Sequence, residues 1–281
     1  MIQNDIQNTI IIKSTRECGF FSCLLGIIYN AYKYRINGIV PYIEWKNPKY
    51  MGNSNDNVFD YFFNQSEKPT HISKEIIEKG LREKDILEMA KCNNRTFREQ
   101  MNHMFNTVCK LNIQTKIEIE TFIKNEKINS KYGFHIRQTD RYKGGKGLVY
   151  AGPTVDTIIN YAITNELDDI YLATDCKNTF SKLENKFKCV SYTTIRSSKN
   201  IGIHESNHIK EKNKQIAKEA LIESYLLSEC KALYRVTSNF TIFSLIVNPT
   251  LPFYDLSKIF KEDIIKHFNL KELYCEDFLS K

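Results

Sequence analysis

The chain of 281 residues has room for one large domain or two ordinary ones, and its 42% hydrophobic and 12% aromatic residues exclude a disordered protein. Its 40 basic and 33 acidic residues give a net charge of +7, without a long run of one sign. We therefore expect a mildly basic globular protein that does not bind nucleic acid, because such binders usually carry a basic stripe or a recognisable module.

The first half of the chain combines short β-branched segments with stretches of helical periodicity. A polar segment at residues 124–131 then separates it from the second half. The predicted elements of the first half are strands at 9–13 and 39–45, a loop at 46–73, and helices at 20–33, 74–89, 96–111 and 115–124.

The second half shows a more regular alternation of strands and helices, which is typical of α/β layers around parallel sheets. We therefore predict an N-terminal lobe over 1–128, a C-terminal lobe over 129–265, and a C-terminal helix over 266–281 that could cross back to the first lobe. The predicted elements are strands at 132–136, 170–173, 189–192, 232–236 and 251–254, helices at 154–165, 178–186, 215–228, 239–247 and 259–278, and a loop at 197–214.

Cysteine usage and hydropathy indicate the cellular setting. The eight cysteines contain no Cys-x-x-Cys pair and no Cys/His zinc spacing. The N-terminus lacks the charged start and apolar core of a signal peptide, and the longest apolar run, at 19–29, is too short to span a bilayer. We expect reduced thiols, no metal site, no membrane span and a cytoplasmic location.

Three predicted strands of the second half end in polar residues suited to an anionic ligand. The first continues into His-Ile-Arg-Gln-Thr-Asp-Arg at 135–141, the second into Ala-Thr-Asp at 173–175, and the third into Val-Thr-Ser-Asn at 236–239. Because ligands of open α/β sheets bind outside the carboxyl ends of strands, we expect the three clusters to share one edge.

These residue types match the chemistry of a nucleotide diphosphate. Arg137 offers a planar fork of donors to phosphate oxygens. Ser238 and Asn239 begin a predicted helix, whose free N–H groups and dipole attract an anion. Glu219 and Glu223 lie one helical turn apart and could accept from a ribose hydroxyl or a base N–H.

Each of these residues also has a purely structural interpretation. Arg137 could be an ion-pair partner, and His135 could be a core histidine. Asp175 and Ser238 could cap the helices that follow them, and the two glutamates could lie on a solvated face. Three such strand ends in order favour the ligand site.

The same segments resemble a known family. Gly-Phe-His-Ile-Arg-Gln-Thr-Asp-Arg at 133–141 is similar to the His-Val-Arg-Arg-Thr-Asp segment of the α1,6-, α1,2- and protein O-fucosyltransferase superfamily. Residues 171–175 resemble its second motif, and residues 220–240 its third. Gly-Phe-Phe-Ser at 19–22 resembles the glycine-aromatic turn that faces the donor. Segments at 41–45 and 57–62 resemble uncharacterised bacterial and viral relatives.

The resemblance implies a GT-B fold of two Rossmann-like lobes, with an acceptor side in the first lobe and the nucleotide-sugar site in the C-terminal lobe. It implies that Arg137 neutralises the β-phosphate of the leaving group, while Asp140 and Asp175 order the site. No metal or other cofactor is implied. The donor-binding residues it implies are Gly19, Phe20, Phe21, His135, Gln138, Asp175, Glu223, Thr237, Ser238 and Asn239.

Two departures from the family pattern affect the prediction. Gln138 replaces the second arginine, so GDP-fucose specificity is in question. The glutamate that serves as general base in the α1,6 enzymes has no counterpart. Asp140 is a candidate base by position, and Glu44 or Asp60 could supply one across the cleft.

We therefore predict a glycosyltransferase that moves a sugar from a nucleotide diphosphate to a glycan hydroxyl, with fucose from GDP-fucose as the first candidate. One alternative is the same fold with another donor, such as UDP-xylose. A second is a non-catalytic carbohydrate-binding protein that kept the fold, although such a protein needs no diphosphate site.

Overall fold

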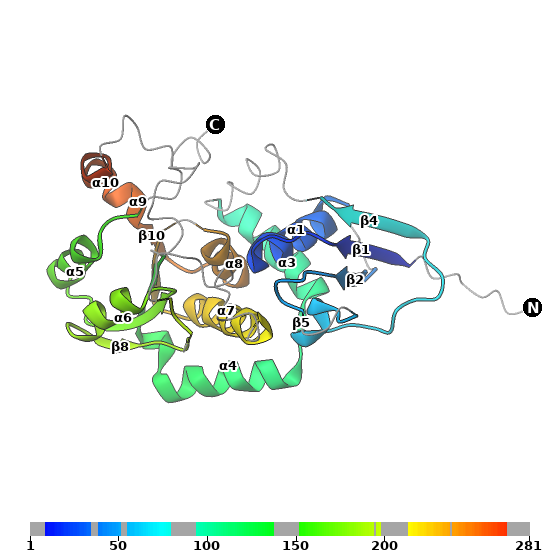
Figure 1. Cartoon of the computed structure of the whole chain (residues 1–281), viewed down its shortest axis with the longest axis horizontal. Helices are drawn as coiled ribbons and strands as arrows, with labels where there is room; N and C mark the ends of the chain where they lie inside the picture. The colour runs from blue at the N-terminus through cyan, green and yellow to red at the C-terminus, as the bar shows by residue number, and fades with distance from the viewer. Residues whose placement is uncertain are drawn as a thin grey trace, which may run out of the picture.

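The computed structural model describes residues 9–34, 39–51, 55–79, 94–137, 152–193, 195–197, 213–236 and 238–268. Two parallel sheets lie toward opposite ends of the molecule, with helices between and around them (Figure 1). We call the part built on the N-terminal sheet the first lobe and the part built on the C-terminal sheet the second lobe. Residue 128, at the predicted boundary, lies in a short 3-10 helix, η3, directly before the first strand of the C-terminal sheet.

The first lobe is built on three parallel strands in the order β2-β1-β4. β1 is the central strand. Its adjacent residues Ile11 and Ile12, which point to opposite faces of the sheet, are both fully buried, as expected for a parallel strand. A two-stranded antiparallel sheet, β3-β5, lies beside it. The strands are β1 (Ile10–Ser14), β2 (Tyr42–Trp45), β3 (Phe63–Asn64), β4 (Lys74–Glu78) and β5 (Lys110–Leu111).

The helix predicted over 74–89 is wrong at its start, because residues 74–78 form β4. This strand pairs with β1, placing Ile76 beside Ile12 and Glu78 beside Ser14. Buried Glu78 accepts a hydrogen bond from Ser14 Oγ at 2.9 Å and pairs with Arg16 at 3.1 Å. These contacts outweigh the helix propensity of a Lys/Glu-rich segment. Residues 80–89 lie outside the described residues.

Helices of the first lobe pack on the sheet and then lead to the second lobe. α1 is apolar on nearly all sides and is buried between the sheet and other helices. α4 runs from the first lobe toward the second (Figure 1) and ends at Lys127 in the left-handed conformation. The helical elements are α1 (Phe20–Lys33), η1 (Val58–Tyr61), α3 (Arg95–Val108), α4 (Ile113–Glu126) and η3 (Ile128–Ser130).

The second lobe is built on five parallel strands in the order β10-β9-β6-β7-β8. Helices cover both faces, which confirms the predicted α/β class. The strands are β6 (Tyr132–Ile136), β7 (Asp169–Thr174), β8 (Lys188–Val190), β9 (Ala232–Arg235) and β10 (Phe253–Asp255), and the helices are α5 (Val155–Thr164), α6 (Lys177–Glu184), α7 (Asn213–Ser228), α8 (Asn239–Val247), α9 (Leu256–Ile259) and α10 (Lys261–Phe268).

Helices α7 and α8 lie between the two sheets and join the lobes (Figure 1). α8 packs against both α1 and α3, so one continuous hydrophobic core contains residues of both lobes. Asn102 on α3 donates to the carbonyls of Ile246 (2.8 Å) and Val247 (3.0 Å), near the C-terminus of α8. These bonds satisfy carbonyls that have no partner within the helix.

The C-terminal helix predicted over 259–278 is divided between α9 and α10, and its remainder lies outside the described residues, as does any crossing back to the first lobe. Within the described ranges, we find no helix that is long and apolar enough to cross a bilayer.

The close approach of α1 to β4 allows a stability test at Gly26. A Cβ atom at this position would overlap the buried Glu78 carboxyl group, approaching its Cδ atom to 2.8 Å. We expect Gly26→Ala to lower the free energy of unfolding by about 1–3 kcal/mol in urea denaturation, although alanine favours helices. Glu120→Ala on the exposed side of α4 is the control and should change it by less than about 0.5 kcal/mol. Equal stabilities of the two variants would contradict this packing.

Candidate functional site

A cavity of about 400 Å³ opens between the lobes at the carboxyl edge of the second sheet, a size typical of sites for small ligands. We call it the interlobe cavity. Its wall consists of Cys18, Gly19, Phe20, Phe21, Ser22, Tyr50, His135, Arg137, Ala173, Thr174, Asp175, Thr193, Ile195, Ile216, Ala217, Glu219, Ala220, Glu223, Asn239 and Phe240.

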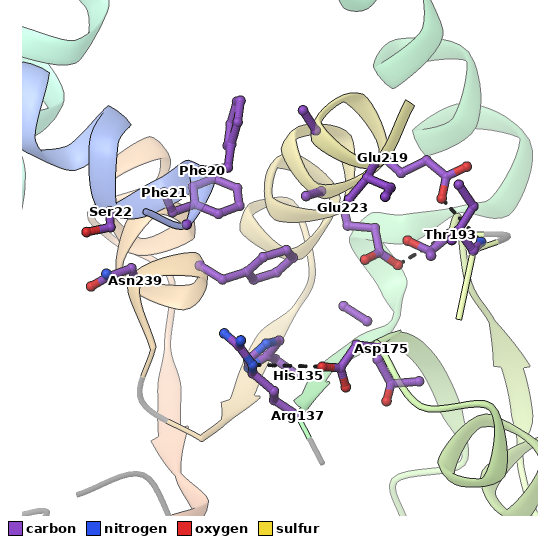
Figure 2. A pocket seen from close by; sticks show the side chains of 18 of the residues that line it. Phe20, Phe21, Ser22, His135, Arg137, Asp175, Thr193, Glu219, Glu223 and Asn239 are labelled. Carbon is purple, nitrogen blue, oxygen red and sulfur yellow. Dashed lines mark hydrogen bonds and ion pairs between the residues drawn. The ribbon is translucent and has the colours of Figure 1, made fainter. Parts of the chain in front are cut away.

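Strand alternation brings the end of β6 and the end of β7 into this cavity. His135 pairs in register with Ala173, and successive side chains of a strand point to opposite faces. His135 and Arg137 therefore share a face with Ala173 and Asp175, and all four line the cavity. The Arg137 Nε atom lies 3.8 Å from Asp175 Oδ2 (Figure 2).

His135 is held by an aromatic neighbour. Its ring stacks on Phe240 at a centroid distance of 4.8 Å and an interplanar angle of 15°. Only 6% of His135 is exposed, and this remaining part faces the cavity. His135 is therefore both a packed residue of the sheet and a residue of the cavity wall, so the two interpretations made from the sequence are compatible.

Two helix N-termini face the interlobe cavity from the same side. Phe20 and Phe21 begin α1 after Gly19, and Asn239 begins α8 (Figure 2). The backbone N–H of Phe20 donates to the Tyr50 hydroxyl at 2.9 Å. The partial positive charges of both helix ends add to the charge of Arg137, so this side of the cavity favours an anion.

Two buried carboxylates form the opposite side of the cavity (Figure 2). Glu219 and Glu223 are 3% and 6% exposed, so the interpretation of a solvated face is wrong. Their oxygens accept backbone N–H groups of the segment after β8, from Ile195 at 3.4 Å and from Thr193 at 3.3 Å. Burial raises the pKa of Glu223 to about 8, although the hydrogen bonds of Thr193 oppose this shift.

The structure brings together most of the residues singled out from the sequence. Asp175 does not cap α6, whose N-cap is Cys176. Ser238 is the N-cap of α8: its buried side chain accepts the Thr241 N–H at 3.3 Å and does not line the cavity. The residues that do line it are Gly19, Phe20, Phe21, His135, Arg137, Asp175, Glu223 and Asn239, while Gln138, Asp140 and Thr237 lie outside the described residues.

The two candidate bases of the first lobe are not in the interlobe cavity. Glu44 pairs with Lys68 at 2.7 Å, and this hydrogen bond lowers the pKa of Glu44. Asp60 accepts a hydrogen bond from Gln65. Glu44 lies on β2, at the edge of the first sheet, and Asp60 is exposed on η1, so both carboxylates are engaged away from the cavity wall formed by α1.

Sequence reasoning missed Tyr50, Thr193, Ile195 and Ile216 in the cavity wall. Thr193 and Ile195 follow β8, so applying the strand-end rule to a fourth strand would have found them. Tyr50 lies in a segment interpreted as a loop, and no local pattern distinguishes it. No cluster of three or more potential metal-ligating side chains occurs within the described part of the chain.

No protein-family model matches this sequence, and no curated protein matches it. Its structure is similar to that of NodZ, an α-1,6-fucosyltransferase, in crystals soaked with GDP-fucose: the TM-score is 0.57 and the identity 16%, over 89% of this chain and 96% of NodZ. Another structure of NodZ, from Bradyrhizobium, matches with a TM-score of 0.56 and 16% identity over 90% and 96% of the two chains.

A NodZ structure co-crystallized with GDP gives a TM-score of 0.53 at 15% identity, over 85% and 92% of the two chains. The fold is similar to that of GT-B fucosyltransferases. This likeness confirms the predicted fold class, including the five-stranded parallel sheet of the C-terminal lobe.

The raised pKa of Glu223 gives a test of its burial. Between its ordinary pKa of 4.5 and about 8, the group is protonated when folded and ionised when unfolded, so stability falls as pH rises. Glu223→Gln cannot ionise. We expect this variant to gain stability over wild type by up to about 1.4 kcal/mol per pH unit in this window, measured by urea denaturation from pH 5 to 9.

Glu120→Gln on the exposed side of α4 controls for the loss of a negative charge. Stability curves of wild type and Glu223→Gln that run parallel from pH 5 to 9 would contradict the buried state of Glu223.

Proposed function

We propose that this chain is a glycosyltransferase that moves a sugar from a nucleotide diphosphate to a hydroxyl group of a glycan, with fucose from GDP-fucose as the first candidate. The observation that carries the proposal is the convergence of Arg137 and the N-termini of α1 and α8 on one interlobe cavity. The fold likeness to NodZ, studied with GDP-fucose and with GDP, supports this class of donor.

The anionic part of the donor fits the side of the cavity formed by α1, α8 and Arg137. When a glycosidic bond to a nucleotide diphosphate breaks, negative charge develops on the leaving phosphate. Donors that are already oriented toward this position stabilise the charge without reorganisation. The guanidinium of Arg137 can donate two parallel hydrogen bonds to phosphate oxygens. Arg137 therefore acts on the leaving group in this proposal.

Asp175 positions Arg137. The two side chains are 3.8 Å apart and partly buried, with 24% and 19% of their surfaces exposed. An ion pair of this kind restricts the rotamers of the long arginine side chain before a ligand arrives. The entropic cost of ordering this side chain on binding is therefore smaller. The structural interpretation of Arg137 as an ion-pair partner and its role toward phosphate are therefore compatible.

The nucleoside fits the side of the cavity formed by α7 and the segment after β8. Glu223 is protonated over most of the neutral range, so its carboxyl group can donate one hydrogen bond while accepting the Thr193 N–H. Glu219 offers a second oxygen pair to hydroxyl or N–H donors. These groups suit the polar edge of a base or a ribose.

The positive groups of the cavity take the place that a metal ion has in other nucleotide-sugar enzymes. Two helix ends and one guanidinium already neutralise a diphosphate in part. The acceptor glycan would approach from the first lobe, where the turn at Gly19 and Phe20 forms the wall opposite the second sheet.

We predict that the protein binds a nucleoside diphosphate without a metal ion. We expect GDP to bind the purified protein in isothermal titration calorimetry with the same affinity in EDTA and in added manganese, since helix ends and Arg137 contact the diphosphate. UDP and GMP serve as comparison ligands: UDP tests the base, and GMP should bind more weakly because it lacks the second phosphate. A strict need for manganese, or equal binding of GMP and GDP, would contradict the diphosphate site.

The catalytic prediction concerns Arg137. We expect Arg137→Ala to lower kcat on the order of a hundredfold, as removal of a preorganised donor does in other enzymes. Arg137→Lys should restore little, because a point charge cannot reproduce the bidentate geometry. The measurement is sugar transfer from the donor that the calorimetry identifies, with the melting temperature taken on the same preparation.

Lys182→Ala, which removes an exposed ion pair with Asp156 elsewhere on the second lobe, is the matched control and should retain wild-type turnover. If Arg137→Ala lowers only the melting temperature and leaves turnover per folded molecule unchanged, Arg137 is structural and the donor site must lie elsewhere.

A further inference from the structure

Two cysteines meet at the edge of the interlobe cavity. The Cys18 Sγ and Cys23 Sγ atoms are 3.1 Å apart, a hydrogen-bonded contact between two thiols. Cys18 precedes Gly19, the N-cap of α1, and Cys23 lies one turn into the helix. A disulfide needs sulfur atoms about 2.05 Å apart. The two sulfurs therefore need to approach by only about 1 Å.

The two thiols differ in their access to reagents. Cys18 is partly exposed and forms part of the cavity wall, whereas Cys23 is buried. Cys23 Sγ lies 3.5 Å from the Arg16 carbonyl oxygen and accepts a weak hydrogen bond from Asn47 Nδ2 at 3.6 Å, and these contacts hold it in place. A small reagent in the cavity can therefore reach Cys18 directly, whereas Cys23 is shielded from it.

The electrostatic surroundings of the two thiols also make Cys18 the more reactive one. The hydrogen bond from Cys23 lowers the pKa of Cys18 to about 6, helped by Ser22 and Arg16 and opposed by burial and Glu78. The N-terminus of α1 also favours a thiolate at this position. The same hydrogen bond and burial raise the pKa of Cys23, which keeps its proton. Cys18 is the nucleophile of the pair.

We propose that Cys18 and Cys23 form a reversible redox pair on the wall of the interlobe cavity, oxidised to a disulfide by a hydroperoxide and reduced by an external dithiol. Cys18 is the attacking residue, and Cys23 is the resolving residue. The proposal assigns a modification site to the chain and does not depend on which ligand the cavity binds.

The chemistry balances in two steps. The Cys18 thiolate attacks one peroxide oxygen, the O–O bond breaks, and the leaving hydroxide takes up a proton as water, which gives a sulfenic acid. The Cys23 sulfur then attacks the Cys18 sulfur, the S–O bond breaks, and the hydroxyl group leaves with the Cys23 proton as a second water. Two thiols lose two electrons, and one hydrogen peroxide is reduced to two waters.

Oxidation would change the cavity directly. The new bond would span Gly19 and the first turn of α1, which carries Phe20 and Phe21 in the cavity wall. It would also remove the negative charge of a Cys18 thiolate from a site whose other features favour anions. Redox state and ligand binding would therefore be coupled through one turn of helix.

Cys176 provides a matched internal control. It is also partly exposed and also lies at the start of a helix, as the N-cap of α6. Among the cysteines that the structure describes, the sulfur–sulfur contact joins Cys18 and Cys23 alone. If partial exposure and a position at the start of a helix were sufficient to make a cysteine reactive, Cys176 would react as fast as Cys18.

The experiment uses the full chain, reduced and then treated with stoichiometric hydrogen peroxide, followed by alkylation with iodoacetamide and tryptic mass spectrometry. Trypsin cuts after Arg16 and Lys33, so both cysteines fall in one peptide, residues 17–33. We expect this peptide to lose two hydrogens and to escape alkylation, and dithiothreitol to restore two alkylated thiols. Cys18 should be alkylated about tenfold faster than Cys176 at pH 7.

Two variants separate the roles of the two cysteines. In Cys23→Ser, a dimedone adduct should accumulate on Cys18, because the resolving thiol is missing. In Cys18→Ser, Cys23 should give no adduct. The proposal would be overturned if the wild-type peptide stays fully alkylatable after peroxide, or if Cys176 reacts as fast as Cys18. Both measurements use the wild-type protein, so neither depends on how well a variant folds.

Discussion

A group of aromatic side chains holds the two lobes in the arrangement on which the interlobe cavity depends. Phe21 of α1 lies 5.1 Å from both Phe240 and Phe243 of α8, measured between ring centroids. Phe240 also stacks on His135 at the end of β6. Phe240 thus connects the first turn of α1, the start of α8 and the central strand of the second sheet. Aromatic pairs of this kind contribute on the order of 1 kcal/mol each beyond the burial of their area.

This packing has an electrostatic consequence. Two helix N-termini that point at one cavity repel each other slightly, and Arg137 adds a full positive charge beside them. The apolar contacts hold these groups together in the absence of any ligand. An anion in the cavity would relieve the repulsion, so the site is organised for negative charge before any ligand binds, which is the property that the proposed sugar transfer would use.

The opposite wall shows how polar groups are buried without being left unsatisfied. Burying a carboxylate is costly unless it is hydrogen-bonded. Glu219 and Glu223 instead accept N–H groups from the segment after β8, whose own backbone would otherwise lack partners at this edge. Desolvation exceeds these gains at Glu223, so that side chain holds its proton. One side of the cavity therefore favours anions, and the other offers the hydrogen-bonding carboxyl groups of two glutamates.

The sequence by itself determined the elements of the second lobe and their shared edge. Buried strands such as β6 are short apolar runs, and polar residues after them mark the carboxyl edge of a parallel sheet, so Arg137 and Asp175 could be expected to meet. Local patterns are sufficient for this because strand alternation and sheet direction fix where such side chains point. Tertiary structure decided those features that depend on contacts between residues distant in the sequence. Pairing with β1 made residues 74–78 a strand despite their helix propensity. Packing across the lobes buried Glu219 and Glu223 and brought Tyr50 into the wall of the cavity, because those environments are supplied by residues far away in the chain.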